Sequence, residues 1–371
     1  MPDPVRVAVL GYGGAGRMHV KRLRALPDVR VTHVFDPELA VEDVPELEPA
    51  GIRFTSHLED ALEGVDAVSI CTPDHTHFRY AQRCIEAGLP TLVEKPLFDT
   101  LEQCDAAERL AADAGVVLGV HHQMRYVPAF RHAYDRVRDG ALGRVLVIAA
   151  DYMHDMRGRA TRFHDWRVQP EHPQNIVLGG LSHTLDLVCW IAGEWPESVA
   201  AFAGHRGWSD YPDMDTVTVS LRFPSGIVAH TTQTIASRGP QRNTLAVYGT
   251  EGQIHDNVHV RDAGTADVTR WPPLRPRRFG ALIGFATRRA LHDPRFRAYP
   301  LSAYEHDLAS ERLLADFVDA VRGRRPFPVS FADGIRVVRL CHACIESYRS
   351  GGVVRIPEGP SDTGTDERRA P

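Results

Sequence analysis

The chain has 371 residues, of which 43% are hydrophobic and 25% charged, and its formal net charge is -5. This composition is typical of a soluble globular protein with two ordinary domains, and the acidic balance argues against a nucleic-acid-binding protein. No run approaches a membrane span, which needs about 20 apolar residues. The first residues lack a secretory signal, and six cysteines do not form a disulfide framework. We therefore expect a cytoplasmic protein with no nucleic-acid or membrane partner.

The first third of the chain alternates short apolar runs with helical patterns. We expect strands at 5–10, 29–35, 67–71, 91–93 and 116–120, and helices at 14–26, 77–87 and 101–114. Apolar strands that alternate with helices predict an α/β fold with a doubly wound parallel sheet covered on both faces.

A glycine-rich turn follows the first strand and opens the first helix. It matches G-x-G-x-x-G, which brings a pyrophosphate against a helix N-terminus. Its members are Gly11, Tyr12, Gly13, Gly14, Ala15 and Gly16. The second strand ends at Asp36, where a carboxylate can accept hydrogen bonds from ribose hydroxyls and repel a 2′-phosphate. We therefore predict a Rossmann domain over residues 1–123 that binds NAD, with NADP less favoured.

Two polar segments follow later strands of this sheet, at the carboxyl ends where ligands bind in open α/β folds. Thr72, Pro73 and His77 follow the strand expected at 67–71, and His77 either contacts the nicotinamide side or simply begins a helix. Glu94 and Lys95 follow the next strand. A lysine beside a cofactor is well placed for proton transfer, although it needs burial to work near neutrality. An ordinary surface lysine is the alternative.

After residue 123 the pattern changes to period-two alternation with short turns. We expect strands at 145–153, 216–223, 227–235 and 244–248, and helices at 305–321 and 334–348. This pattern predicts an α+β domain with a large open antiparallel sheet over residues 124–357. Residues 271–300, rich in arginine and proline, are read as a solvated loop or as a site for an anionic substrate. Residues 358–371 are read as a disordered tail.

The motifs, taken in order, resemble those of the Gfo/Idh/MocA oxidoreductase family, named for glucose–fructose oxidoreductase and inositol dehydrogenase. They are the glycine turn, Asp36, T-P-x-x-x-H at 72–77, E-K-P at 94–96, H-Q-M-R-Y-x-P at 122–128, G-A-L-G-R-V at 140–145, G-G-L-S-H-T-L-D at 179–186, and the closing segments 324–330 and 347–357. The resemblance covers residues 5–357, and the E-K-P and histidine segments are its most specific parts.

The resemblance implies hydride transfer between NAD(H) and a secondary alcohol or ketone of a sugar or cyclitol. It also implies a homodimer or homotetramer built through the antiparallel sheet. Lys95 would be the general acid/base, His183 its partner, and Glu94 would lie near the nicotinamide ribose. Asp186, three residues after His183 and on the same helical face, either orients the imidazole or has a structural role. Arg125 is either a substrate contact or part of a structural ion pair.

One position departs from the family pattern. Many members carry an aspartate four residues before the histidine, and here that position is Gly179. Either Lys95 and His183 suffice, or another acid enters the site. Asp165 is the candidate for that acid, with a packing role for its segment as the alternative.

Other chemistries have less support in the sequence. Cys341 and Cys344 have C-x-x-C spacing, which suits zinc or redox chemistry, but they lie in a helical apolar pattern and are read as buried small residues. His121 and His122 show no further ligand group at metal spacing, so we predict no metal site. No G-x-S-x-G elbow supports a hydrolase.

Two alternative functions stay open. An enzyme of this fold can use bound NAD transiently for epimerisation, elimination or glycoside cleavage, as some family relatives do. A non-catalytic NAD-binding regulator is the other alternative, and the presence of both Lys95 and His183 argues against it.

Overall fold

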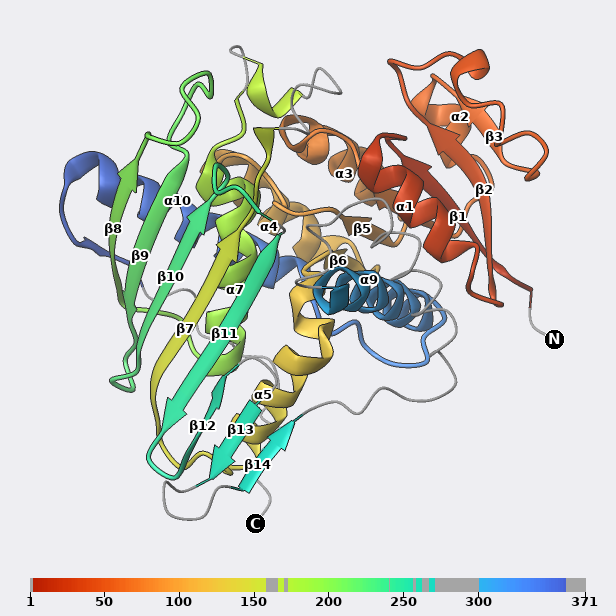
Figure 1. Ribbon diagram of the computed structural model, residues 1–371. Helices are drawn as coiled ribbons and strands as arrows, with labels where there is room; N and C mark the ends of the chain where they lie inside the picture. The colour runs from red at the N-terminus through yellow and green to blue at the C-terminus, as the bar shows by residue number, and fades with distance from the viewer. Residues whose placement is uncertain are drawn as a thin grey trace.

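The structure is a computed structural model that describes residues 3–157, 166–169, 173–239, 241–255, 258–261, 267–270 and 300–357. A parallel sheet forms the first part of the chain and a larger mixed sheet the second, with helices packed between and around them (Figure 1). The predicted loop at 271–300 lies outside the described residues except for its last residue, and the predicted tail at 358–371 lies outside them entirely.

The first sheet has six strands in the order β3-β2-β1-β4-β5-β6, and every neighbouring pair is parallel. The strands are β1 (Val5–Leu10), β2 (Val29–Phe35), β3 (Arg53–Thr55), β4 (Ala67–Ile70), β5 (Thr91–Val93) and β6 (Leu118–Val120). The helices are α1 (Gly14–Leu23), α2 (Leu58–Leu62), α3 (His77–Glu86), α4 (Leu101–Asp113) and the 3₁₀ turns η1 (Val41–Asp43) and η2 (Asp74–Thr76). The predicted doubly wound sheet is confirmed. Strand β3 and helix α2 were not expected, because such short elements show no periodic pattern.

The strand order reverses between β1 and β4, at the centre of the sheet. Every residue of β4 and β5 is buried, so these strands form the centre of the domain. The glycine turn and the loops after β4 and β5 leave the sheet at its carboxyl edge. In open α/β sheets this is where ligands bind.

The second sheet has nine strands in the order β14-β13-β12-β11-β7-β10-β9-β8-β15. The strands are β7 (Val145–Met153), β8 (Ser198–Gly204), β9 (Thr216–Arg222), β10 (Val228–Thr234), β11 (Arg242–Gly249), β12 (Gly252–His255), β13 (Val258–Arg261), β14 (Asp267–Arg270) and β15 (Val354–Arg355). Its pairs are antiparallel except β7 with β10, which run parallel in continuous register. The predicted antiparallel sheet is therefore mixed at its centre.

One face of this sheet is covered by helices, and the other is open as far as the described part of the chain is concerned. The predicted alternation holds in β9, where Val217, Val219 and Leu221 are buried while the residues between them are exposed. Helices α7 (Ser182–Ala192) and α10 (Phe331–Ser350) contact the sheet from one side (Figure 1). On the strands, Leu146, Phe202 and Val228 are exposed large hydrophobic residues.

The remaining helices connect the two sheets. They are the 3₁₀ turns η3 (Gln123–Tyr126) and η4 (Trp166–Val168), the π-helical turn η5 (Val177–Leu181), and helices α5 (Pro128–Arg138) and α9 (Pro300–Val321). Helix α9 contacts α1, and α10 contacts α4 and β6 as well as β8. The C-terminal helices, which the sequence assigns to the second domain, therefore also pack on the first.

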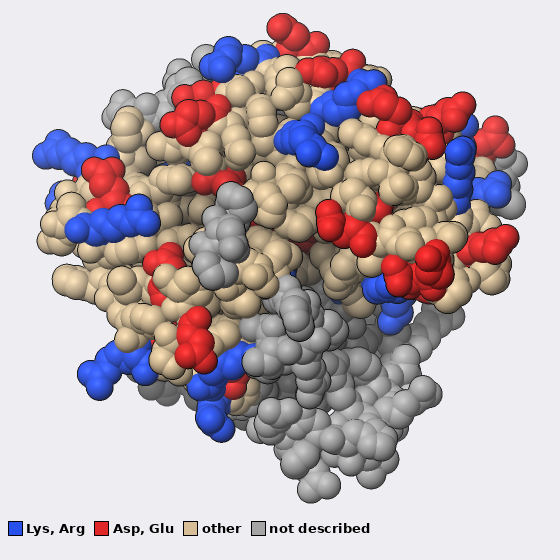
Figure 2. All heavy atoms as spheres, turned by 90° about the horizontal axis from the view of Figure 1, so that it is seen from above, with Lys and Arg blue, Asp and Glu red and all other residues tan. Residues whose placement is uncertain are grey.

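Acidic and basic side chains are interspersed over the face of the molecule seen in Figure 2, in keeping with the small net charge. Within the part of the chain that the structure describes, no helix combines the length and the apolar character needed to cross a membrane.

Candidate active site

The glycine turn has the shape that a pyrophosphate requires. Gly11 has φ +88°, and a Cβ atom there would lie 2.7 Å from the backbone nitrogen of Thr72. A Cβ atom on Gly16 would lie 1.9 Å from the carbonyl oxygen of Gly11, so the helix could not pack against the strand. A Cβ atom on Gly13 would meet nothing within 4 Å, and no side chain caps the N-terminus of α1 there. The open space and the helix N-terminus without a side-chain cap fit a phosphate ligand.

Asp36 is fixed beside this turn. Its Oδ2 accepts a hydrogen bond from the backbone N–H of Tyr12 at 2.8 Å, and its Oδ1 accepts one from the N–H of Glu38 at 3.0 Å. The Tyr12 ring is buried beneath Arg17, whose guanidinium lies 4.2 Å from the ring centroid. Tyr12 thus contributes its backbone to the turn, and the carboxylate of Asp36 is held beside that turn.

His77 holds two of the loops together. It is fully buried, its Nδ1 lies 2.8 Å from the carbonyl oxygen of Pro96, and its Nε2 lies 2.9 Å from that of Thr72. The hydroxyl of Thr72 accepts a hydrogen bond from Thr76 at 2.8 Å. His77 is also the first residue of α3. This geometry favours the interpretation of His77 as a residue that begins α3, over the interpretation as a contact to the nicotinamide side.

Lys95 reaches across to the second domain. Its Nζ donates a hydrogen bond to the carbonyl oxygen of Gly179 at 2.5 Å. Gly179 belongs to the π-helical turn η5, a rare helical form that often occurs at functional sites. This turn leads directly into α7, whose second residue is His183. The structure therefore brings Lys95 to the turn that immediately precedes His183.

His183 is held between the helix and the sheet. It is 6% exposed, and its ring stacks on Tyr152 of β7 with 5.5 Å between centroids and 28° between planes. Nearly every residue of α7 is buried, as expected for a helix enclosed on all sides. The imidazole is consequently shielded from bulk water, which favours controlled proton transfer.

Arg125 and Asp186 form a buried ion pair. Arg125 donates to Asp186 through Nε at 3.0 Å and through a terminal nitrogen at 2.5 Å, and a second terminal nitrogen lies 3.4 Å from Asp333. Burial lowers the pKa of Arg125, but the charges of Asp186 and Asp333 outweigh it and raise that pKa. This geometry favours the structural readings of both residues, because the pair ties η3 to α7 and α10.

Glu94 lies on the other side of the strand end and holds two histidines. Its Oε1 accepts from Nε2 of His19 at 2.9 Å and Nδ1 of His121 at 3.0 Å, and its Oε2 accepts from the backbone N–H of Lys95 at 3.1 Å. The other ring nitrogens have serine partners, Ser69 for His19 and Ser310 for His121, each at 2.8 Å.

The hydrogens of this network can be assigned from its donors. Arg22 donates to Oγ of Ser310 at 2.7 Å, so the serine hydroxyl is free to donate to Nε2 of His121. In its neutral form His121 then carries its proton on Nδ1 and donates it to Glu94, whereas in its charged form Nε2 also donates, to Ser310. Every member of the network has a partner without any bound ion.

The surroundings favour the charged forms of Glu94 and His19 in this network. Burial raises the pKa of Glu94, but the charge and hydrogen bond of His121 and those of His19 outweigh it, and that pKa lies well below its ordinary value. Burial lowers the pKa of His19, but interactions with Cys71 and the hydrogen bond to Glu94 outweigh it, and that pKa is raised. Among the described residues these three side chains place ligand-type atoms within 4.8 Å of one another, close enough to hold an ion.

The sequence reasoning about His121 missed this cluster. A signal existed, because Val93 of β5 pairs with Val120 of β6, so the next residues, Glu94 and His121, lie side by side. His19 could not be found this way, since it comes from α1.

The remaining residues singled out from the sequence are the two cysteines of the C-x-x-C spacing and Asp165. Cys341 and Cys344 are fully buried, and burial raises the pKa of both thiols, which confirms the reading as small core residues. Asp165 lies outside the described residues.

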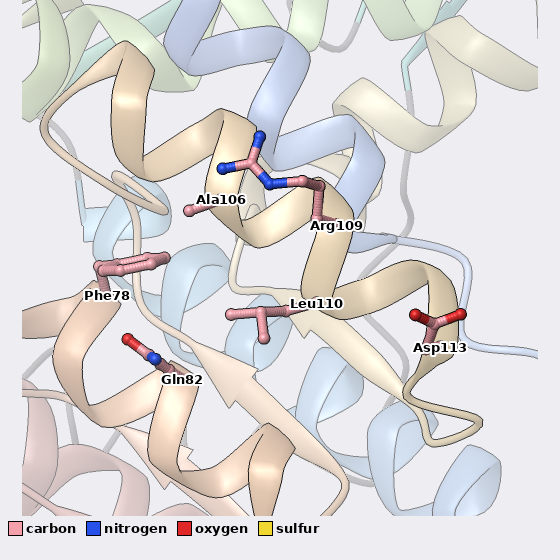
Figure 3. A pocket seen from close by; sticks show the side chains of 6 residues that line it. All are labelled: Phe78, Gln82, Ala106, Arg109, Leu110 and Asp113. Atoms are coloured by element: carbon pink, nitrogen blue, oxygen red, sulfur yellow. The ribbon is translucent and has the colours of Figure 1, made fainter.

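A surface hollow of about 450 Å³ lies between α3 and α4 (Figure 3). Its lining residues are Phe78, Gln82, Ala106, Arg109, Leu110 and Asp113. None of the residues predicted for the site lines it, and it lies on the helical cover of the first sheet. The hollow is therefore separate from the candidate catalytic residues.

Comparison with known proteins gives relatives over nearly the whole chain. Scyllo-inositol 2-dehydrogenase (NAD(+)) of Bacillus subtilis is 28% identical over 379 residues, which cover 98% of this chain and 100% of the relative. UDP-N-acetylglucosamine 3-dehydrogenase of Acidithiobacillus ferrooxidans is 26% identical over 346 residues, with 92% and 96% covered. The solved structure of levoglucosan dehydrogenase in complex with NADH is similar with a TM-score of 0.79, at 21% identity and with 96% and 100% covered.

Family models match both parts of the chain. Residues 5–122 match the oxidoreductase family with an NAD-binding Rossmann fold, and residues 130–255 match the GFO/IDH/MocA C-terminal domain. The two matches follow one another along the chain and contain most strands of both sheets, so the protein is an oxidoreductase of the Gfo/Idh/MocA family.

Proposed function

We propose that this oxidoreductase transfers hydride between NAD(H) and a secondary alcohol or ketone of a sugar or cyclitol, with Lys95 as general acid/base and His183 as its partner. The observation that carries the proposal is the hydrogen bond from Nζ of Lys95 to Gly179, in the turn that leads into the His183 helix. The relatives named for inositol and for UDP-N-acetylglucosamine support the substrate class.

The use of lysine in this chain supports the role of Lys95. Of its 43 lysine and arginine residues only Lys21 and Lys95 are lysines, and Lys21 is exposed on α1. A guanidinium does not give up its proton in proteins, whereas a lysine can exchange one when its surroundings are suitable. Lysine therefore occurs at the position where a proton has to move.

The residues of the chain would share the work as follows. A bound nicotinamide accepts or supplies the hydride. Lys95, between the first and second domains, would hold the substrate oxygen and take or return its proton. His183 would approach the same oxygen from α7. The buried Arg125–Asp186 pair keeps that helix in place, so the two groups stay aligned.

We infer NAD rather than NADP as the preferred cofactor. Asp36 presents a carboxylate beside the glycine turn, and no arginine follows it directly. A 2′-phosphate would meet this negative charge without a partner. We expect at least about tenfold lower kcat/KM with NADP, equal to 1.4 kcal/mol, and steady-state rates with both cofactors test this.

The direct test is a panel of inositols, aminocyclitols, hexoses and nucleotide sugars with NAD, followed by the absorbance of NADH. We expect turnover with at least one of them and none in Lys95→Met, with NADH affinity unchanged. Substrate conversion without accumulating NADH would instead identify the transient use of bound cofactor. Equal rates in the wild type and in Lys95→Met would contradict the assignment of Lys95.

The open face of the second sheet is the proposed contact between copies in a homodimer or homotetramer. Phe202 and Val228, which alternate with buried residues of β8 and β10, are exposed on its strands, at 77% and 48%. Light scattering should show an oligomer, and Phe202→Asp should shift it toward the monomer. A monomeric wild-type protein would rule this contact out.

A further inference from the structure

Gly179 leaves room for a side chain from elsewhere in the chain. A Cβ atom on Gly179 would lie 2.7 Å from both Cδ and Oε1 of Gln174. Such a contact is far closer than real Cβ atoms tolerate, so the Gln174 carboxamide occupies the space that a side chain at position 179 would need. The carbonyl oxygen of the same glycine holds Nζ of Lys95.

Asp74 holds Gln174 in this place. Nε2 of Gln174 donates a hydrogen bond to Oδ2 of Asp74, which is 5% exposed and lies just beyond the carboxyl end of β4. Because a carboxylate accepts only, the NH₂ group must face Asp74, and Oε1 is left free to accept a hydrogen bond elsewhere. The hydroxyl of Tyr211 also donates to the backbone oxygen of Gln174.

Two links therefore cross between the domains side by side. Asp74 follows β4 and contacts Gln174, while Lys95 follows the neighbouring strand β5 and contacts Gly179. Both links end on the short segment from 174 to 179, which leads into the His183 helix. Its neighbour Asn175 is tied to Asp213 at 2.7 Å and to Tyr348 at 3.1 Å, so the segment has a fixed base.

We propose that Asp74 and Gln174 form a positioning pair that takes the place of a carboxylate at position 179. Gln174 packs on the Gly179 peptide and fixes the carbonyl oxygen that directs Lys95, and Asp74 fixes Gln174. The inference rests on the proposed function of Lys95. It replaces the sequence-based candidate Asp165 with residues whose contacts are described.

The pair differs from a carboxylate in one physical respect. The oxygen that accepts from the ammonium group of Lys95 is the peptide oxygen of Gly179, which orients this group without carrying a full charge. A carboxylate attached at position 179 would favour the charged form of Lys95 more strongly. The negative charge of Asp74 lies one side chain further away, behind the Gln174 amide.

Removal of the amide tests the positioning role. Gln174→Met keeps the length of the side chain but cannot hold Asp74, and Asp74→Asn weakens the same contact. We expect kcat to fall about 10- to 100-fold in both, the size of effect that a small misplacement of a reacting group causes, with KM and the NADH dissociation constant within about twofold. Gln82→Met is the matched control, because Gln82 makes the same kind of bond to Glu86 at 2.9 Å on the exposed face of α3.

A carboxylate moved to position 179 distinguishes a positioning role of Gln174 from simple packing. Gln174→Ala clears the space over Gly179, and Gly179→Asp added to it supplies a carboxylate there. We expect the double variant to recover at least a third of the kcat that Gln174→Ala loses, with its rate–pH profile moved to higher pH. A kcat for Gln174→Met that equals that of Gln82→Met, or no recovery in the double variant, would overturn the proposal.

A measurement on the protein without substrate keeps the inference separate from the proposed function. With lysine labelled at Cε, only two NMR signals arise, and Lys21→Arg identifies the signal of Lys95. We expect the titration midpoint of Lys95 to change in Gln174→Met and to rise in the double variant, but not in Gln82→Met. If the wild type turns over no substrate, the proposed function fails, while this titration still tests whether Asp74 and Gln174 position Lys95. Identical midpoints in all variants would reject it.

Discussion

Glu94 and Lys95 are neighbours in sequence, but their side chains lie in opposite surroundings. Successive side chains of an extended strand point to opposite faces. His121, which follows β6, contacts Glu94, whereas the charge of Lys95 acts on the next residue, His122. On the first face every donor and acceptor of the Glu94 network is paired. On the second face Lys95 contacts a backbone oxygen.

His122 deepens this contrast. It is 1% exposed, and neither ring nitrogen has a hydrogen-bond partner among the described residues. Burial is the main cause that lowers its pKa, with Arg125 and Lys95 acting in the same direction and Asp186 opposing them. A satisfied polar cluster holds structure together, whereas a buried imidazole without a hydrogen-bond partner among the described residues suits a site where a ligand or water completes the set. Substitutions on the Glu94 face should therefore change stability, and those on the Lys95 face should change turnover.

The largest effect should come from Lys95→Arg. The guanidinium keeps the positive charge but cannot give up a proton, so we expect kcat to fall roughly 10³-fold, within the range that general acid–base catalysis contributes. Lys21→Arg is the matched control and should leave kcat unchanged, since Lys21 is exposed on α1. Steady-state rates and thermal unfolding check both. A Lys95→Arg rate near that of the control would show that charge alone is needed.

His183→Asn should reduce kcat by about 10²-fold, because the amide can still accept or donate a hydrogen bond but does not exchange protons near neutral pH. The loss should be smaller than for Lys95→Arg, since His183 is proposed as the partner of the lysine. Its stacking on Tyr152 gives the control: Tyr152→Phe keeps the ring contact and should retain most of the activity. Should His183→Asn lose stability instead of turnover, the histidine would belong with the structural cluster.

The fold was readable from the sequence where periodic patterns are long. The bounds of β1, β2, β5 and β7 agree with the predicted ranges, and the runs of β1, β2 and β5 end at a glycine or an acidic residue. Strand β8 was missed, because Ala200, Ala201 and Ala203 give only a weak β pattern. The parallel pairing of β7 with β10 depends on contacts between segments some eighty residues apart, which no local pattern carries.

The candidate site was readable only in part. Lys95, Asp36 and the glycine turn follow strands directly, so the sequence order already places them at one edge. Gln174 has no such signal: it lies in an irregular segment, and its role depends on the missing side chain of Gly179. Sequence reasoning found the gap at 179, but only a structure shows which side chain fills it.

On the opposite face, Glu94→Gln should mainly destabilise the protein. The amide cannot accept hydrogen bonds from both imidazoles with the same strength, and disruption of a buried ionic contact costs about 3 kcal/mol. We expect this loss in chemical unfolding, with the NADH dissociation constant within about threefold. Asp66→Asn, which breaks the exposed pair with Arg6, should cost less than about 1 kcal/mol. A large loss of NADH affinity would instead support a direct role for Glu94 at the nicotinamide ribose.

The difference in stability between the wild type and Glu94→Gln should depend on pH with a defined sign. The lowered pKa of Glu94 gives stability that is complete above the ordinary carboxyl value and is lost as pH falls through the folded value. The raised pKa of His19 gives stability that is complete below its ordinary value and is lost as pH rises through the folded value. The stability gap between wild type and Glu94→Gln should therefore be widest between about pH 4.3 and 6.5. A gap independent of pH would exclude charge as its source.

The smallest effect should come from Ser310→Ala, at the outer end of the Glu94 network. Ser310 lies on α9, accepts from Arg22 at 2.7 Å and contacts His121 at 2.8 Å, so its hydroxyl joins α9 to the first domain. Its removal leaves Nε2 of His121 without a donor, and we expect a loss of about 1 kcal/mol with kcat unchanged. Ser209→Ala, which removes an exposed bond to Asp210 at 3.1 Å, should change neither. A drop in kcat for Ser310→Ala without loss of stability would mean that the two faces of the strand end are coupled, because hydrogen bonds connect Ser310 to the backbone of Lys95 through His121 and Glu94.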